Sequence, residues 1–318
     1  MAIIGTDIKA AARILQSGGL VAIPTETVYG LAANAFSEEA VVKIFEAKNR
    51  PAFDPLIVHT YSVEAFSQIA GTIPDMAYQL AEAFMPGPLT LILPKAKQVP
   101  LLVTSGNETV GLRIPNHPLT LQLLRELDFP LAAPSANPFG YVSPTTAQHV
   151  AHQLGSRIPY ILDGGACAVG IESTIISLAG GQVQILRLGG LAQEEIEQVL
   201  GRPVDRVQTS SSNPEAPGML ISHYAPGKKL VVGDLPALRE QFSGRSVGVL
   251  AFSKAIAGIP EKHQVVLSPA ADVREAAQTL FSALRYLDGQ EIDFILAEYV
   301  PEVGLGRAVN DRLRRASR

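Results

Sequence analysis

Short apolar runs that alternate irregularly with amphipathic helical patterns place the tightest limit on how this chain can fold. The runs are too short for helices and end at proline, glycine or polar residues, so they predict buried strands. Residues 6–16 show the helical pattern, with Ala11, Ala12 and Leu15 on one face and Gly18 just beyond the end. The irregular order of strands and helices predicts an α/β fold with a twisted mixed sheet and flanking helices.

The order of these elements changes along the chain. Up to residue 200 the predicted strands are 20–24, 55–60, 89–94, 109–114, 130–134, 159–163, 173–178 and 183–188, and the predicted helices are 6–16, 37–47, 74–84, 117–127, 145–154 and 192–200. After residue 226 the predicted strands are 229–233, 246–252, 264–268 and 292–299, and the helices are 235–242, 270–288 and 305–316. The second set alternates regularly and predicts a small Rossmann-like parallel α/β domain.

Residues 201–226 interrupt both patterns. Three consecutive serines stand among proline and glycine in the first half, which is typical of a domain boundary. The second half, residues 217–226, contains apolar and aromatic side chains that a simple spacer does not need. The sequence therefore predicts domains at 1–200 and 227–318, joined by a linker at 201–226 that also acts as a lid.

Composition excludes several classes of function. The chain has 26 basic and 30 acidic side chains, so no global positive field attracts nucleic acid. Cys167 is the only cysteine, which excludes disulfides, zinc fingers and iron–sulfur clusters held by this chain alone. No apolar run approaches the ~18 residues of a membrane helix, and the N-terminus lacks the basic start of a signal peptide. A cytoplasmic location is expected.

A cluster of cations stands in the stretch A-K-N-R-P-A-F-D-P-L-I-V-H. Lys48 and Arg50 lie two residues apart where a helical pattern ends, and Pro51 and Pro55 then hold the backbone extended. Cations at a helix C-terminus are also common on ordinary solvated helices. The polar segments elsewhere in the chain favour the alternative, an anion-binding site.

Six short segments rich in Ser, Thr, Pro and Gly fall at predicted strand ends, at 24–30, 109–115, 133–137, 143–145, 170–175 and 185–190. Each alone is typical of an ordinary turn. Together, their hydroxyls and backbone amides, with an arginine, can form a cradle for phosphate and carboxylate. The chain has no P-loop and no G-x-S-x-G motif. His149 and His152 lie three apart on a predicted helix, with no third metal ligand nearby.

These segments, in this order and spacing, resemble the YrdC-like family, in the long two-domain form of the L-threonylcarbamoyladenylate synthases. K-x-R at 48–50 and S-x-N at 135–137 are the paired signature of that family. P-G-M…H-Y-A-P at 217–226 resembles the linker of the long form, and G-L-G-x-A…R-L at 304–313 resembles its end. The resemblance covers essentially the whole chain and makes residues 1–200 the catalytic domain.

The resemblance implies a reaction and its partners. The family joins L-threonine, bicarbonate and ATP, with Mg²⁺ accompanying ATP, to give threonylcarbamoyl-AMP and pyrophosphate. Downstream threonylcarbamoyl transferase proteins then make N6-threonylcarbamoyladenosine in tRNA, so tRNA is an indirect partner and no membrane is involved. A carbamate oxygen can attack the α-phosphorus itself, so the enzyme needs cations and alignment rather than a nucleophile of its own.

The resemblance also implies roles for individual residues, and no metal held by the chain itself. Lys48 and Arg50 are expected to contact phosphate oxygens and to carry catalysis. The expected threonine-site residues are Thr27, His59, Arg113, Ala133 and Ser173. The expected ATP-site residues are Arg50, Asp54, Thr109, Ser135, Asn137, Ser143, Arg187 and Tyr224. Arg113 is expected to form a two-pronged contact with the threonine carboxylate.

Two of these positions carry further expectations. The family often has asparagine where this chain has Asp54, and a carboxylate beside a triphosphate repels it unless Mg²⁺ lies between them. Arg50 is expected at the entrance of the site, where its replacement abolishes adenylate formation and leaves the fold intact.

Two other functions could use a chain of this kind. Carbamoyl transfer in hydrogenase maturation uses a related domain together with cysteine-rich zinc modules, which a single cysteine excludes. An RNA-binding module of the same fold predicts a basic domain, whereas residues 1–206 carry 13 basic and 18 acidic side chains. The basic tail, with Arg312, Arg314, Arg315 and Arg318, is expected to be a solvated helix end rather than a docking patch.

Overall fold

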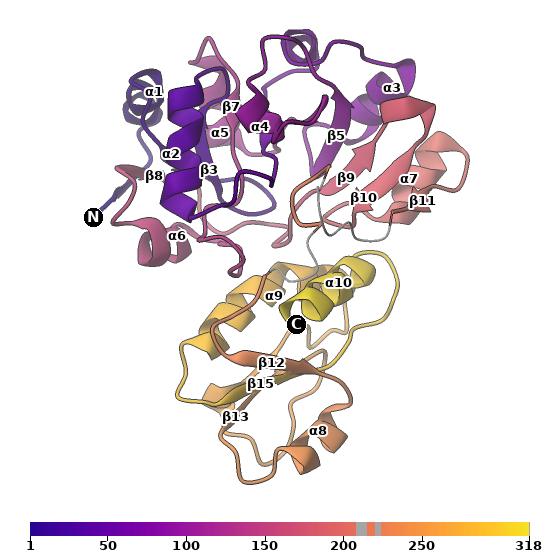
Figure 1. The fold of residues 1–318 in the computed structure, drawn as a ribbon. Helices are drawn as coiled ribbons and strands as arrows, with labels where there is room; N and C mark the ends of the chain where they lie inside the picture. The colour runs from indigo at the N-terminus through magenta and orange to yellow at the C-terminus, as the bar shows by residue number, and fades with distance from the viewer. Residues whose placement is uncertain (208–214, 220–223, 318) are drawn as a thin grey trace.

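Two β-sheets organise the chain in the computed structural model, which describes residues 1–207, 215–219 and 224–317. The large sheet has the order β1-β8-β2-β3-β7-β4-β6-β5-β9-β10-β11, and the small sheet has the order β12-β15-β13-β14. The large sheet is mixed, whereas all pairs of the small sheet are parallel. Figure 1 shows the two sheets in separate parts of the molecule, with the small sheet at the bottom. The predicted fold class is confirmed.

The strands of the large sheet are β1 (Ile3–Gly5), β2 (Val21–Ile23), β3 (Gly30–Asn34), β4 (Ile57–His59), β5 (Leu89–Pro94), β6 (Thr109–Arg113), β7 (Leu131–Ala132), β8 (Tyr160–Leu162), β9 (Thr174–Ser177), β10 (Gln184–Arg187) and β11 (Asp205–Arg206). The helices of this part are α1 (Ile8–Gln16), α2 (Glu38–Lys48), α3 (Asp75–Phe84), α4 (Leu101–Thr104), α5 (Pro118–Arg125), α6 (Ala147–Leu154) and α7 (Gln193–Leu200). Two 3₁₀ turns, Glu64–Gln68 and Ala179–Gly181, complete it.

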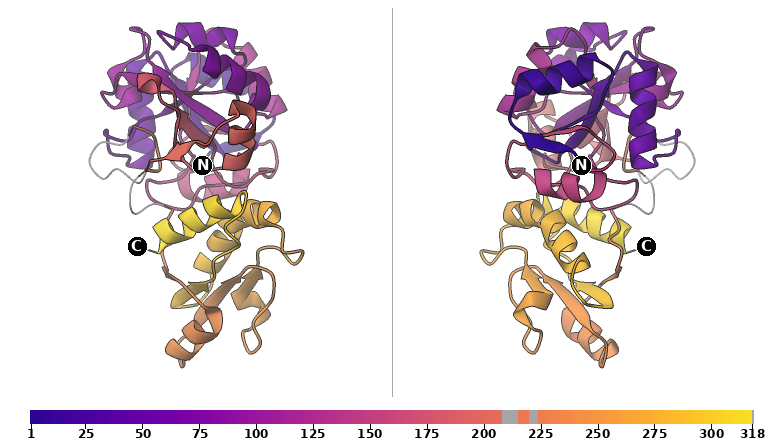
Figure 2. Two further views of the ribbon diagram at one scale, coloured as in Figure 1. Left: turned by 90° about the vertical axis from the view of Figure 1, so that its right-hand side faces the viewer. Right: turned by 90° about the vertical axis from the view of Figure 1, so that its left-hand side faces the viewer.

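The C-terminal part contains β12 (Lys229–Val232), α8 (Leu235–Gln241), β13 (Val247–Ala251), a 3₁₀ turn at Glu261–His263, β14 (Gln264–Val266), α9 (Val273–Asp288), β15 (Phe294–Ala297) and α10 (Gly306–Ala316). Figures 1 and 2 show α9 and α10 between the small sheet and the larger part, with α8 at the far end. The longest helix of the small domain is therefore in a position to contact the larger one.

Four short elements were not predicted: β1, β3, α4 and β11. β3 reads Gly-Leu-Ala-Ala-Asn and is almost entirely buried, so small side chains replace the β-branched residues that usually indicate a strand. β11 lies inside the stretch predicted as linker, and its Asp205 and Arg206 pair in parallel with β10. The large sheet therefore continues six residues beyond position 200.

The local sequence around helix α2 positions Arg50, which lies just beyond the end of the helix. Ser37 caps the helix by accepting a hydrogen bond from the Ala40 amide. The helix ends at Asn49, whose φ of 51° is left-handed, a conformation that asparagine tolerates better than most residues. The chain then turns sharply into Arg50 and Pro51, and this turn directs Arg50 inward.

One hydrophobic cluster is shared by the two parts of the molecule. It combines Leu280, Phe281 and Leu284 of α9 with Ile171 and Val142, which lie in loops of the larger part. The loop at 169–173 approaches α9 so closely that a Cβ on Gly170 would lie 2.4 Å from the Cα of Gln278. The small domain is thus packed against the larger one rather than merely tethered to it.

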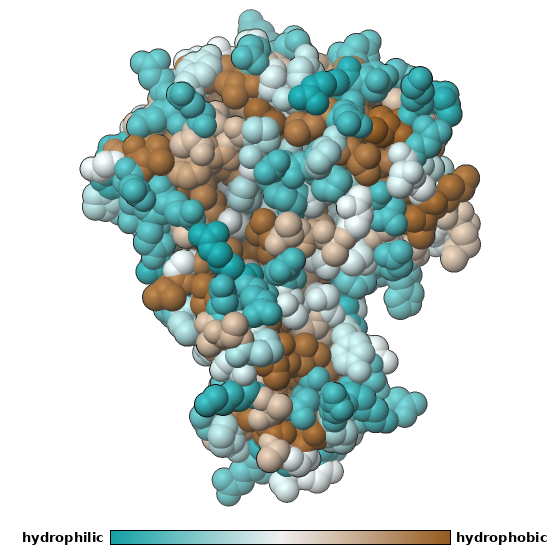
Figure 3. Space-filling view, turned by 180° about the vertical axis from the view of Figure 1, so that it is seen from behind, coloured by the Kyte–Doolittle hydropathy of each residue, from teal (hydrophilic) through white to brown (hydrophobic). Residues whose placement is uncertain are grey.

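The surface away from this interface is mainly polar. On the face opposite that of Figure 1, hydrophilic residues divide the apolar ones into separate patches (Figure 3). Cys167 is buried. Among the residues that the structure describes, no helix has the length and apolar character required to cross a membrane.

Candidate functional site

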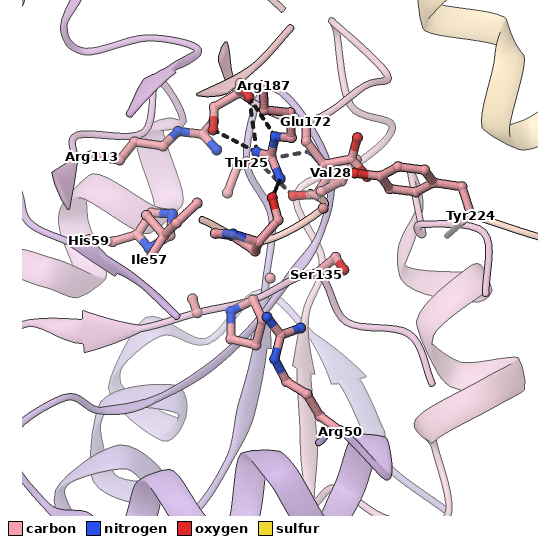
Figure 4. A pocket seen from close by; sticks show the side chains of 16 residues that line it. Thr25, Val28, Arg50, Ile57, His59, Arg113, Ser135, Glu172, Arg187 and Tyr224 are labelled. Atoms are coloured by element: carbon pink, nitrogen blue, oxygen red, sulfur yellow. Dashed lines mark hydrogen bonds between the residues drawn. The ribbon is translucent and has the colours of Figure 1, made fainter. Parts of the chain in front are cut away.

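Strand ends and loops of the large sheet surround one pocket (Figure 4). The space inside it that is open to a water-sized molecule is about 50 Å³. It is lined by Thr25, Val28, Gly30, Arg50, Ile57, His59, Arg113, Ala133, Pro134, Ser135, Glu172, Ser173, Arg187, Pro217, Gly218 and Tyr224. Seven sequence segments that are far apart in the chain therefore meet here, and five of them belong to the polar segments at predicted strand ends.

Arg113 occupies one wall, beside His59 on the neighbouring strand. His59 and Arg113 are register partners at the ends of the parallel strands β4 and β6. Arg113 Nη2 donates to Thr27 Oγ1 at 2.8 Å and lies 2.9 Å from Glu26 Oε1, and Nε donates to the Gly87 carbonyl at 3.4 Å. Among the described residues, only its Nη1 nitrogen has no hydrogen-bond partner. Nη1 is therefore the guanidinium nitrogen that is left for a ligand, and the two-pronged contact with the threonine carboxylate stays a prediction.

His59 is a neutral polar group in this wall. Its side chain is buried, and its Nδ1 atom has no hydrogen-bond partner in the described part of the chain. Burial, together with the positive charge of Arg113, lowers the pKa of His59 to about 3. The imidazole therefore provides hydrogen bonding without adding a further positive charge to the pocket wall.

We expect His59 to remain neutral between pH 8 and pH 5. The unfolded chain has the ordinary histidine pKa of ~6.5, so the unfolded state gains a proton in this range and the folded state does not. The contribution of His59 to the free energy of unfolding should therefore be complete above pH ~6.5 and should be lost as the pH falls toward the folded pKa of about 3. The NMR signal of a carbon-bound imidazole proton of His59 can be assigned because it is absent in His59→Gln. Its chemical shift should not change between pH 8 and pH 5. A titration midpoint near 6.5 would contradict this.

Arg50 lies opposite and is held by a carboxylate. Its Nη2 is 2.9 Å from Asp54 Oδ2, Nε donates to the Asp54 carbonyl, and Nη2 also donates to the Pro55 carbonyl. The side chains of Arg50 and Asp54 are 3% and 0% exposed. Burial lowers the pKa of Arg50 and raises that of Asp54, while each charge opposes the effect on the other. Asp54 does not line the pocket, and its charge is directed at Arg50 rather than toward a ligand.

Lys48 connects the two signature motifs. Its Nζ donates to the carbonyls of Ser135 and Asn137, both at 2.5 Å, and the residue is 1% exposed. Burial, with the charge of Arg50, lowers the pKa of Lys48. Lys48 is therefore behind the pocket wall, where it holds the loop that presents Ser135, and it does not face the space where phosphate oxygens were expected.

Arg187 is different from the other two pocket arginines. Its Nε and Nη2 donate to the Ser173 carbonyl at 3.1 and 2.9 Å, and Nη1 donates to the Pro217 carbonyl at 3.0 Å. No carboxylate lies within ion-pair distance of it among the described residues, whereas Arg50 pairs with Asp54 and Arg113 with Glu26. Burial lowers the pKa of Arg187, so an arriving anion would relieve the cost of burying this cation.

Glu172 is a pocket residue to which the sequence analysis assigned no role. Its Oε1 accepts from Ser143 Oγ at 2.5 Å, and its Oε2 accepts from Arg312 Nε at 3.0 Å. Arg312, expected in a solvated helix end, is 0% exposed, so that interpretation is wrong for this residue. Both residues lie in stretches that the sequence marked, Glu172 in the polar segment at 170–175 and Arg312 in the motif at 304–313, but only the fold shows that they meet.

The other predicted residues lie at varying distances from the pocket. Predicted residues that line it are Arg50, His59, Arg113, Ala133, Ser135, Ser173, Arg187 and Tyr224. Thr27, Lys48, Asp54 and Ser143 contact lining residues from behind, and the Asn137 side chain instead donates to the Pro138 and Tyr141 carbonyls. Thr109 is at the opposite end of β6 from Arg113.

Comparison with known proteins gives consistent matches along the whole chain. Residues 13–189 match the Sua5/YciO/YrdC family, described as telomere recombination, and residues 191–318 match the C-terminal domain of threonylcarbamoyl-AMP synthase. The threonylcarbamoyl-AMP synthase of Pyrococcus abyssi is 45% identical over 98% of this chain and 94% of its own length. That of Bacillus subtilis is 42% identical over 98% and 93%. The crystal structure of P. abyssi Sua5 complexed with L-threonine matches with a TM-score of 0.93 and 42% identity, covering 100% of this chain and 97% of that one.

Proposed function

The chain belongs to the two-domain threonylcarbamoyl-AMP synthases of the Sua5/YrdC family, which are enzymes, and on that premise we propose the reaction that it catalyses. It joins L-threonine, bicarbonate and ATP to give L-threonylcarbamoyl-AMP and pyrophosphate. The observation that carries this proposal is the convergence of Arg50, Arg113 and Arg187 on one pocket of hydroxyls and a neutral imidazole. Such a pocket suits crowded anions, because fixed cations in a buried site interact with them strongly.

The proposed chemistry needs no enzyme nucleophile. The threonine amine and bicarbonate form a carbamate with loss of water, and a carbamate oxygen attacks the α-phosphorus while pyrophosphate leaves. The protein must align the reactants and neutralise their charge. The pocket hydroxyls, Ser135 and Ser173, have no histidine as hydrogen-bond partner in the described residues. They are suited to hold oxygen atoms of the substrates rather than to attack them.

The threonine and nucleotide parts of the pocket can be assigned to different walls. We assign the threonine carboxylate to Arg113 Nη1, with His59 beside it. We assign the phosphates to Arg187 and Arg50, and Tyr224, which enters from the side away from His59 in Figure 4, to the nucleotide. The solved Sua5 structure whose description names L-threonine supports a threonine site in this fold.

Mg²⁺ enters the proposal as a companion of ATP. Within the described residues no group of three or more His, Cys, Asp or Glu side chains could hold a metal. The carboxylates nearest the pocket, Glu26, Asp54 and Glu172, are each paired with an arginine. These residues do not form a resident metal site, which fits an ion that arrives bound to the triphosphate.

The remaining parts of the proposal concern organisation. We propose a catalytic domain at 1–200 and a C-terminal domain at 227–318, with product passed to threonylcarbamoyl transferase proteins that modify tRNA in the cytoplasm. The linker is proposed as a lid, although 208–214 and 220–223 lie outside the described residues. Its described part supports this role, since Pro217, Gly218 and Tyr224 line the pocket.

The direct test is pyrophosphate release by the purified full chain. We expect release only when ATP, threonine and bicarbonate are all present, with threonylcarbamoyl-AMP detected by mass spectrometry. Omitting any one of the three is the control. Pyrophosphate release that does not depend on threonine, or a product without the threonylcarbamoyl group, would overturn the proposed function.

A further inference from the structure

A buried ion pair joins the C-terminal helix to the wall of the pocket. Arg312 of α10 donates from Nε to Glu172 Oε2 at 3.0 Å, and its side chain is 0% exposed. Glu172 lines the pocket, 140 residues away in sequence. An unpaired carboxylate is expensive to bury, and here the partner that offsets this cost comes from the other domain.

The carboxylate of Glu172 lies at a position where an uncompensated negative charge would weaken nucleotide binding. It precedes Ser173, whose carbonyl and hydroxyl accept hydrogen bonds from Arg187. It also accepts from Ser143 on its other oxygen, so its carboxylate is fixed against the wall. An uncompensated negative charge at this position would repel a triphosphate and compete with it for Arg187.

Arg312 is held in place on several sides. Its guanidinium lies 5.0 Å from the ring centroid of Tyr224, and its Nη1 donates to Asp311 at 3.0 Å. Tyr224 in turn stacks on Phe281 of α9, with ring centroids 5.7 Å apart. The guanidinium is therefore fixed between the linker tyrosine and Glu172, and it does not line the pocket itself.

A second arginine of the small domain restrains the neighbouring loop. Arg285 of α9 donates to the carbonyls of Val142 and Ser143, and its guanidinium lies 5.2 Å from the Tyr141 ring centroid. Ser143 is the residue that bonds to the other oxygen of Glu172. The C-terminal domain therefore contacts Oε2 of Glu172 directly through Arg312, and it restrains the Ser143 loop, which bonds to Oε1, through Arg285.

We propose that Arg312 is a positioning residue of the nucleotide site: it neutralises Glu172 and holds it away from Arg187, so that Arg187 remains available to the phosphates of ATP. The inference rests on the function proposed above. It gives the C-terminal domain a defined part in the reaction, which is to set the charge of a pocket built almost entirely by the other domain.

Three full-chain variants test this role. Arg312→Met keeps an unbranched stem against Tyr224 but removes the charge. Arg312→Met/Glu172→Gln removes both charges, and Arg314→Met is the matched control on the same helix, where Arg314 is 44% exposed and pairs with Glu302. The initial rate of pyrophosphate release is measured against ATP and, separately, against threonine, and folding is checked by thermal unfolding.

We expect Arg312→Met to raise the KM for ATP by about 30-fold or more, the effect of stranding one partner of a buried charge pair. The KM for threonine should change by less than about 3-fold, as should both values in Arg314→Met. Adding Glu172→Gln should recover most of the ATP affinity, because the stranded charge is then gone. An equal rise in both KM values, or no recovery in the double variant, would overturn the proposal in favour of a merely structural contact.

A second comparison applies if Arg312→Met does not fold. Glu172→Gln alone and the double variant should then have ATP KM values within about 3-fold of each other, since Arg312 has no charge left to neutralise. A much higher KM in the double variant would overturn the proposal. Wild-type protein without threonine-dependent pyrophosphate release would instead refute the proposed function, so the two failures are distinguishable.

Discussion

Replacing Arg50 by alanine should abolish threonylcarbamoyl-AMP formation and also destabilise the protein by about 3–5 kcal/mol. The substitution leaves Asp54, which is 0% exposed, without the cation that faces it at 2.9 Å. The carbonyls of Asp54 and Pro55 also lose their donors. The expected position of Arg50 at an entrance is wrong, since its side chain is 3% exposed, and this buried pairing is why a loss of stability is expected in place of an unaffected fold.

The two effects of this substitution can be separated. Arg50→Met/Asp54→Asn removes both members of the pair, so most of the stability should return in chemical denaturation. Activity should remain at least about 100-fold below wild type, the usual cost of losing one electrostatic contact to a transition state. Near-normal turnover in the double variant would show that Arg50 only supports the fold, and full stability in Arg50→Ala would contradict the buried pair.

Arg113→Lys should weaken threonine binding by about 100-fold while changing ATP affinity by less than about 3-fold. Arginine satisfies Glu26, Thr27 and the Gly87 carbonyl with Nε and Nη2 and still has Nη1 for a ligand. A lysine ammonium has three donors on one nitrogen. It cannot reach these partners and a carboxylate together, although it keeps the positive charge.

Isothermal titration calorimetry with threonine and with ATP, each on the full chain, measures the two losses. Lys95→Arg is a matched control, since Lys95 makes only a long 3.9 Å ion pair with Glu108. Equal losses for both ligands would refute the assignment of Arg113 to threonine. A fully retained threonine affinity would show that the carboxylate binds elsewhere.

The sequence predicted those parts of the fold that depend on local patterns. The amphipathic helices and the apolar strands lie close to the predicted ranges. β3 was missed because burial on both sides selects small residues, and β11 because two residues of an edge strand carry no periodic signal. These elements are defined by their neighbours in the sheet, and single-sequence patterns do not contain that information.

The sequence predicted which residues line the candidate site better than it predicted what each of them contacts. The motifs pointed to Arg187, Arg113 and Ser135, which do line the pocket. They could not show that Lys48 bonds to the backbone carbonyls of Ser135 and Asn137, since this depends on how helix α2 packs against the loop. Arg312 was judged from its position near the chain end, whereas its burial is determined by contact with Glu172 in the other domain.

The hydrophobic cluster shared between α9, α10 and the loops at 142 and 171 has a consequence for folding cooperativity. Tyr224, Val28 and Phe281 belong to one packed unit, so a loss of this cluster should disturb α9 and the pocket loops together. The two domains are then expected to be coupled in unfolding. A cavity made beneath α9 should therefore lower the population of molecules with an ordered pocket, because Phe281 of α9 stacks on Tyr224, which lines the pocket.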